Sequence, residues 1–171
     1  MNRSAKTPAD RKSMLDLTKL SFGGPAAIVT SMALIVGLDA ATATKATVVT
    51  SLLIIGVADN LTDSLSMHIY QESERLDERR ALQTTTANFA TRLAVAISFV
   101  CIFLVSSRPV GLYADLLWGF LLLAGLSYLL ARARGVSPIA EICKHSAVAA
   151  TVILVSKVIG ASLASLSASW R

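Results

Sequence analysis

The sequence predicts an all-α, polytopic membrane protein with five transmembrane helices, the N-terminus cytoplasmic and the C-terminus on the opposite side. Of the 171 residues, 54% are hydrophobic and 16% are charged, whereas a typical soluble domain has about 25% charged residues. The mean hydropathy is +0.62, and the apolar residues gather in stretches close to the roughly 20 residues that span a bilayer. This composition excludes an ordinary soluble enzyme.

The chain divides into a basic tail, residues 1–21, and a transmembrane domain, residues 22–171. We expect transmembrane helices near residues 22–39, 46–71, 88–107, 110–131 and 139–166. In the tail, Thr7-Pro8 begins a predicted short amphipathic helix over residues 8–20. Its leucines and basic residues favour a position along the cytoplasmic membrane interface, the alternative being a frayed tail.

Helix-breaking residues set the later boundaries. Arg108-Pro109 and Gly111 close the third span and open the fourth, and Gly135 stops the fourth. Ser137-Pro138 is typical of an N-cap followed by proline at the first helical position.

The basic residues set the predicted orientation. Twelve lie in the tail, the second loop and the fourth loop, and three lie on the opposite side. Arg92 is counted here with the second loop. The excess places the tail in the cytoplasm. In a bacterial cell, we expect the protein to lie in the inner membrane. The excess also explains the net charge of +5, so no nucleic-acid partner is expected.

The second span carries the candidate chemistry. On a helical wheel, one polar arc holds the residues Asp59, Asn60, Asp63, Ser66, Met67 and Tyr70. Ile54, Val57, Leu61, Leu65 and Ile69 form the opposite, apolar arc. Polar groups at membrane depth face protein or water rather than lipid. We therefore expect the polar arc to face inward.

The polar arc predicts a site for a divalent metal ion that exchanges with protons. Asp59 and Asp63 are one turn apart, about 5–6 Å between Cβ atoms, so both ionise only beside a cation. Asn60, Ser66 and Tyr70 are secondary ligands, and the Met67 thioether favours Fe(II) or Mn(II). Glu72 and Glu74 extend the acidic stripe toward the cytosol, as an entry path for cations or as a plain solvated turn.

Other interpretations remain open. The polar arc could only hold helices together, with Lys157 either pairing with Asp59 or extending to the membrane surface. An intramembrane aspartyl protease fits poorly, because its carboxylates come from different helices. We find no phosphate-binding loop and no nucleophile with a base, so we expect neither an enzyme nor a bound cofactor. A non-transporting membrane scaffold is the alternative to a transporter.

Several stretches resemble the vacuolar iron transporter family. They are Gly23 to Thr30 with Ala33 to Gly37, Ser64 to Met67, and Val155 to Gly160. The resemblance implies a five-span, proton-coupled exporter of Fe(II) and Mn(II) that works as a homodimer with the ion path near the dimer interface. Small residues at Ala33 and Gly37 and at Gly160 and Ala164 would permit such close helix contacts.

The sequence also departs from the family pattern. Pro25-Ala26-Ala27 replaces the Asn-Asp-Gly triplet of the first helix, and the family's Ser-Met-x-x-x-Glu pattern ends here in Gln71, with Glu72 one residue late. The long cytoplasmic metal-binding insertion is reduced to a short charged turn. Our hypothesis is that the metal site has moved onto the second helix, at Asp59 and Asp63.

Overall fold

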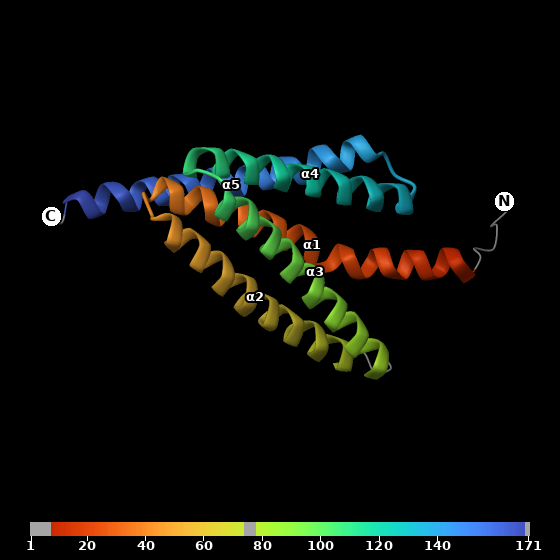
Figure 1. The fold of residues 1–171 in the computed structure, drawn as a ribbon. Coiled ribbons are helices and arrows are strands. Elements are labelled where there is room, and N and C mark those ends of the chain that lie inside the picture. The colour runs from red at the N-terminus through yellow and green to blue at the C-terminus, as the bar shows by residue number, and fades with distance from the viewer. Residues whose placement is uncertain (1–7, 74–77, 170–171) are drawn as a thin grey trace.

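The computed structural model describes residues 8–73 and 78–169, which form five α-helices (Figure 1). They are α1 (Pro8–Ala40), α2 (Lys45–Ser73), α3 (Glu78–Val105), α4 (Arg108–Arg134) and α5 (Pro138–Ser169). These two described ranges contain no strand, so the all-α prediction is confirmed. Each helix contains a segment long and apolar enough to cross a membrane.

The helix ends follow the predicted breaking residues. Ser107 is the N-cap of α4, with proline in its first turn, and α5 begins at Pro138. Gly135 ends α4 with a φ of 70°, a left-handed conformation that glycine adopts at little cost. The N–H of Val136 then reaches back to the carbonyl of Ala131 at 3.0 Å, which closes the last turn.

Two helices begin well before their predicted first residues. The helix expected over residues 8–20 continues into the first span, so that α1 is one helix from Pro8 to Ala40 with Pro25 inside it. Figure 1 shows α1 changing direction along its length, as helices containing proline do. The third helix begins at Glu78 rather than near residue 88, because the polar residues between them include no glycine or proline to stop it.

α1 lies between two antiparallel helix pairs (Figure 1). It contacts all four other helices, whereas α2 packs mainly on α3 and less closely on α1. The α2–α3 pair diverges from the rest of the bundle toward the end where α2 stops and α3 starts (Figure 1).

The apolar core forms where α1 crosses α3 and α4. Met32 and Ile35 of α1 pack with Phe99 and Phe103 of α3, and all four are at most 1% exposed. Gly119 of α4 makes this packing possible. A Cβ atom built there would lie 2.3 Å from the Met32 sulfur and 3.2 Å from the Phe99 ring.

The backbones of α1 and α5 meet at two glycines. A Cβ atom built on Gly160 would lie 2.0 Å from the carbonyl oxygen of Gly37. The small-residue pattern of the sequence predicted that both glycines lie at contacts between subunits. In the structure they contact each other within one chain. They set how closely α5 approaches the central helix.

We expect Gly160→Ala to lower the free energy of unfolding by about 1–3 kcal/mol, the usual penalty for overpacking, because the new methyl group would meet rigid backbone. The matched control is Gly125→Ala in α4, where a Cβ atom would meet nothing within 4 Å. That change should be neutral or stabilise by up to about 1 kcal/mol through helix propensity. Thermal unfolding of both variants in detergent tests this, and equal effects would contradict it.

Candidate functional site

α2 has the two faces that the sequence predicts. The five residues of its apolar arc are all exposed, from 47% at Val57 to 61% at Ile54. Asn60 and Ser64 are buried, at 2% and 7%, and α2 packs closely on α3. The apolar arc thus covers the outer surface of the pair, and the polar side of α2 is available to α3.

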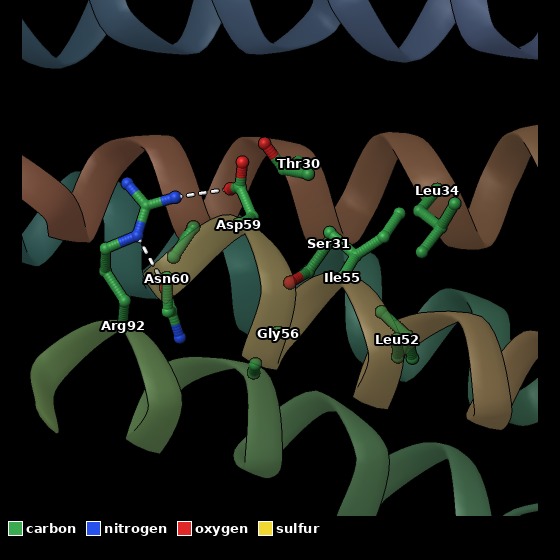
Figure 2. A pocket seen from close by; sticks show the side chains of 11 residues that line it. Thr30, Ser31, Leu34, Leu52, Ile55, Gly56, Asp59, Asn60 and Arg92 are labelled. Carbon is green, nitrogen blue, oxygen red and sulfur yellow. Dashed lines mark hydrogen bonds and ion pairs between the residues drawn. The ribbon is translucent and has the colours of Figure 1, made fainter. Parts of the chain in front are cut away.

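The polar side of α2 meets Arg92, a residue of α3 that is 2% exposed. Its Nη2 donates to Asp59 and its Nη1 pairs with Asp63. Its Nε donates to the side-chain oxygen of Asn60 at 2.6 Å. Figure 2 shows the contacts with Asp59 and Asn60. One guanidinium thus joins three neighbouring side chains of α2, which we call the Arg92 cluster.

The Arg92 cluster retains a negative charge and access from outside. Two carboxylates face one guanidinium, so one formal negative charge remains when both acids are ionised. The Arg92 side chain is only 3% exposed, but those of Asp59 and Asp63 are each 45% exposed. The carboxylates therefore present oxygen atoms on the open side of the α2–α3 pair.

α1 forms the third wall of the cluster. Asp59, Asn60 and Arg92 line a small hollow together with Thr30 and Ser31 of α1 (Figure 2). Its free volume is about 10 Å³, close to the minimum that holds one water molecule. Its polar lining consists of the Asp59 carboxylate, the Asn60 amide, two hydroxyls and the Arg92 guanidinium, so the hollow is polar on the side of the cluster.

Glycine at position 23 allows α3 to approach α1 beside the cluster. A Cβ atom built on Gly23 would lie 2.1 Å from the side-chain oxygen of Asn88 and 2.6 Å from Cδ of Arg92. Asn88 and Arg92 are one helical turn apart on α3 and contact the same point of α1. The Asn88 oxygen is buried and has no hydrogen-bond partner.

The structure brings together only part of the predicted metal site. Asp59, Asp63 and Asn60 meet at Arg92, whereas Ser66 and Tyr70 are exposed and do not contact it. Oε1 of Glu72 lies 3.4 Å from Nε2 of His68, which belongs to the same helix. The side chain of Met67 and all of Glu74 lie outside what the structure describes. Among the described residues, no group of three or more His, Cys, Asp or Glu side chains is placed to hold a metal ion.

Arg92 is the main residue that the sequence interpretation misplaced. It was counted as a loop charge, although the helix predicted over residues 88–107 already contains it. A charge inside an apolar helix needs an opposite charge nearby, and the aspartates of the preceding helix supply it. The sequence interpretation instead weighed Lys157 as the partner of Asp59. Lys157 is exposed on α5, which packs on α1 and α4.

One acid was not considered in the sequence interpretation. Asp115 of α4 is 1% exposed, and neither of its carboxyl oxygens has a hydrogen-bond partner. It lies one turn from both Gly111 and Gly119, which pack against Phe103 and Phe99 respectively. It thus belongs to the apolar core rather than to the Arg92 cluster.

A serine and a histidine join α4 to α5. Ser127 lies 2.7 Å from Nδ1 of His145, but its hydroxyl also donates to the carbonyl of Leu123 at 2.6 Å. A hydroxyl has one proton, so Nδ1 is the donor to Ser127. With Ser127 only 1% exposed, this pair fits a contact between helices rather than a nucleophile and its base.

Replacing both acids, as in Asp59→Asn with Asp63→Asn, leaves Arg92 buried without a counter-charge. Breaking a buried ion pair lowers the free energy of unfolding by about 3–5 kcal/mol. Because the two carboxylates are half-exposed, we expect a decrease toward the lower end of that range. Adding Arg92→Met to this double variant should restore most of the lost stability, because it removes the unpaired buried charge. Asp39→Asn is the control, because its partner Arg108, at 3.1 Å, is part-exposed, and about 1 kcal/mol at most is expected. Urea unfolding checks this, and a triple variant no more stable than the double would contradict it.

The chain was compared with models of protein families, with curated proteins and with solved structures, and nothing matches in any of the three comparisons. The resemblance to the vacuolar iron transporter family therefore rests on the short stretches quoted from the sequence.

Proposed function

We propose that this protein is an integral membrane protein whose five helices all cross the bilayer, with the N-terminus in the cytoplasm. Each helix has a sufficiently long apolar segment, and large apolar side chains are exposed along the bundle, among them Leu117 and Leu121 of α4 and Leu154 and Val158 of α5. In water such a surface would be an aggregation hazard, whereas lipid solvates it. The membrane would be the inner membrane in a bacterium.

We further propose that it is a secondary transporter that exports divalent transition-metal ions, Fe(II) or Mn(II), from the cytosol in exchange for protons. The observation that supports this is the pair Asp59 and Asp63, which holds one more negative charge than Arg92 neutralises and is half-exposed. Acids within membrane helices mark ion pathways more often than structural contacts. The same two carboxylates can bind a divalent cation or take up protons.

The ligands proposed at the site are carboxylate and amide oxygens with nearby hydroxyls. Asp59 and Asp63 are the primary ligands and proton carriers, and Asn60, Thr30 and Ser31 complete an oxygen-rich wall. Such ligands suit Mn(II), and also Mg(II). Met67 remains the proposed source of selectivity for softer ions, with Ser66 and Tyr70 further along the path and Glu72 and Glu74 at its cytoplasmic mouth.

We propose that the transporter is a homodimer in which a second copy seats along α1 and α5. A groove of about 410 Å³ runs between these helices and is lined mainly by small and apolar residues. Thr30 and Leu34 line both this groove and the hollow beside Asp59. A second copy in the groove would therefore cover the open side of the Arg92 cluster and place an ion path near the dimer interface.

A membrane scaffold is the second candidate function. The observation that favours it is Arg92 itself, since its three contacts join α2 to α3 and polar side chains can hold membrane helices together. In a scaffold, these contacts would serve assembly and no ion would pass.

The deciding experiment is metal flux into proteoliposomes that enclose a metal-sensitive dye, with and without a pH gradient. We expect Mn(II) and Fe(II) flux that depends on the gradient and falls at least about tenfold in Asp63→Asn, since even outer-shell partners of a metal are worth about 10–100-fold. This single change leaves Arg92 with Asp59 and Asn60, so the fold should survive. Asp39→Asn, an acid of α1 paired with Arg108, should keep normal flux.

The absence of flux for any ion from a well-folded dimer would contradict the transporter proposal and favour the scaffold. Normal flux in Asp63→Asn would show that ions pass elsewhere.

A further inference from the structure

We propose that Arg92 is a tethered competitor for the cation site. Its guanidinium occupies the place between Asp59 and Asp63 when no metal is bound, and it turns toward Asn88 when a divalent cation binds. This inference rests on the proposed transport function and adds the residue that sets which cations can enter.

The guanidinium is already where a bound cation would sit. It contacts one oxygen of each carboxylate through separate nitrogen atoms, so it bridges two acids one helical turn apart. A divalent ion shared by the same two carboxylates would occupy the same position. Because the two positive charges would then lie side by side between the same two carboxylates, they would repel each other, and the metal and the guanidinium cannot both remain there.

The structure also holds a buried acceptor that nothing uses. The side-chain oxygen of Asn88 is buried without a partner, as is the hydroxyl of Ser64. Unpartnered buried polar atoms are costly and call for an explanation. Asn88 precedes Arg92 by one turn, and both side chains reach the same point beside Gly23. The guanidinium can therefore turn to Asn88 without leaving its own helix.

Turning the guanidinium changes all three contacts of the Arg92 cluster together. Nε of Arg92 donates to Asn60 at 2.6 Å, and Asn60 is 2% exposed. Because the guanidinium nitrogens lie in one rigid plane, turning the group releases Asn60 together with both carboxylates, while the aliphatic stem stays beside Gly23. The change requires no movement of a helix.

A tethered single charge discriminates by valence. A sodium or potassium ion would replace one positive charge with another and gain nothing over a guanidinium already in place. A divalent ion would neutralise both carboxylates and leave no net charge between them. Arg92 therefore excludes the abundant monovalent cations and admits divalent ones.

The test measures Mn²⁺ binding to the full-length protein in detergent. Titration calorimetry gives the affinity at a fixed, mildly alkaline pH, with and without excess Na⁺. Arg92→Gln should bind Mn²⁺ about tenfold more tightly than the wild type, or better, and should become sensitive to Na⁺, because the competitor is gone. Asn88→Leu should bind several-fold more weakly, because the displaced guanidinium has no acceptor. Thr91→Val, beside Arg92 but outside the cluster, should bind as the wild type does.

The outcomes separate this inference from the proposed function. If Arg92→Gln is folded and binds Mn²⁺ no more tightly, while Asp59→Asn and Asp63→Asn abolish binding, the site stands and Arg92 is not a competitor. If the two Asp variants leave binding unchanged, the proposed site itself fails. Should Arg92→Gln not fold, Arg92→Lys replaces it. Its ammonium cannot bridge both acids in a fork, so tighter Mn²⁺ binding supports the inference and unchanged binding overturns it.

Discussion

A guanidinium inside an apolar helix has to find negative charge, and the Arg92 cluster is how this chain meets that requirement. Arg92 sits in the apolar segment Thr85–Val105, and Asp59 and Asp63 sit in the segment that precedes it along the chain. Neither set of charges is tolerable alone, because an unpaired buried charge is far more costly than a paired one. Their pairing fixes how α2 and α3 face each other and keeps the apolar arc of α2 on the outside.

The same pairing links the outer helix pair to the central helix. α2 has few large buried side chains, chiefly Val48 and Leu52 near its start, and the α2–α3 pair diverges from the bundle beyond them (Figure 1). Arg92 and Asn88 of α3 pack on Gly23 of α1. In the proposed mechanism, an ion that displaces the guanidinium would release the contacts that join α3 to α2 beside α1.

Much of the fold could be predicted because its signals are local. Pro109, Gly135 and Pro138 act on their own backbone and set helix ends without help from the rest of the chain. The apolar arc of α2 is visible in the sequence because its period is that of the helix. Asp59, Asp63 and Asn60 were identified as candidate site residues because acidic and other polar side chains are costly in an apolar span.

What the sequence did not reveal depends on contacts between helices. Arg92 was counted as a loop charge although the helix predicted over residues 88–107 contains it, and its position near Asp59 depends on how α2 packs against α3. Gly37 and Gly160 carry the pattern for close helix packing, but the pattern is the same whether the partner is in the same chain or in another. Asp115 is a single acid at a helix face, and only the fold shows that this face is the aromatic core.

In the proposed mechanism, Asp59, Asp63 and Arg92 form one cation site with two alternative occupants, the guanidinium and a divalent metal ion. The most direct measurement is a structure of the full-length protein in lipid, determined by electron cryo-microscopy or from crystals using anomalous scattering, with and without Mn²⁺. We predict Mn²⁺ between the two carboxylates and the Arg92 guanidinium turned to Asn88. Mn²⁺ bound elsewhere, with Arg92 still bridging Asp59 and Asp63, would contradict the account.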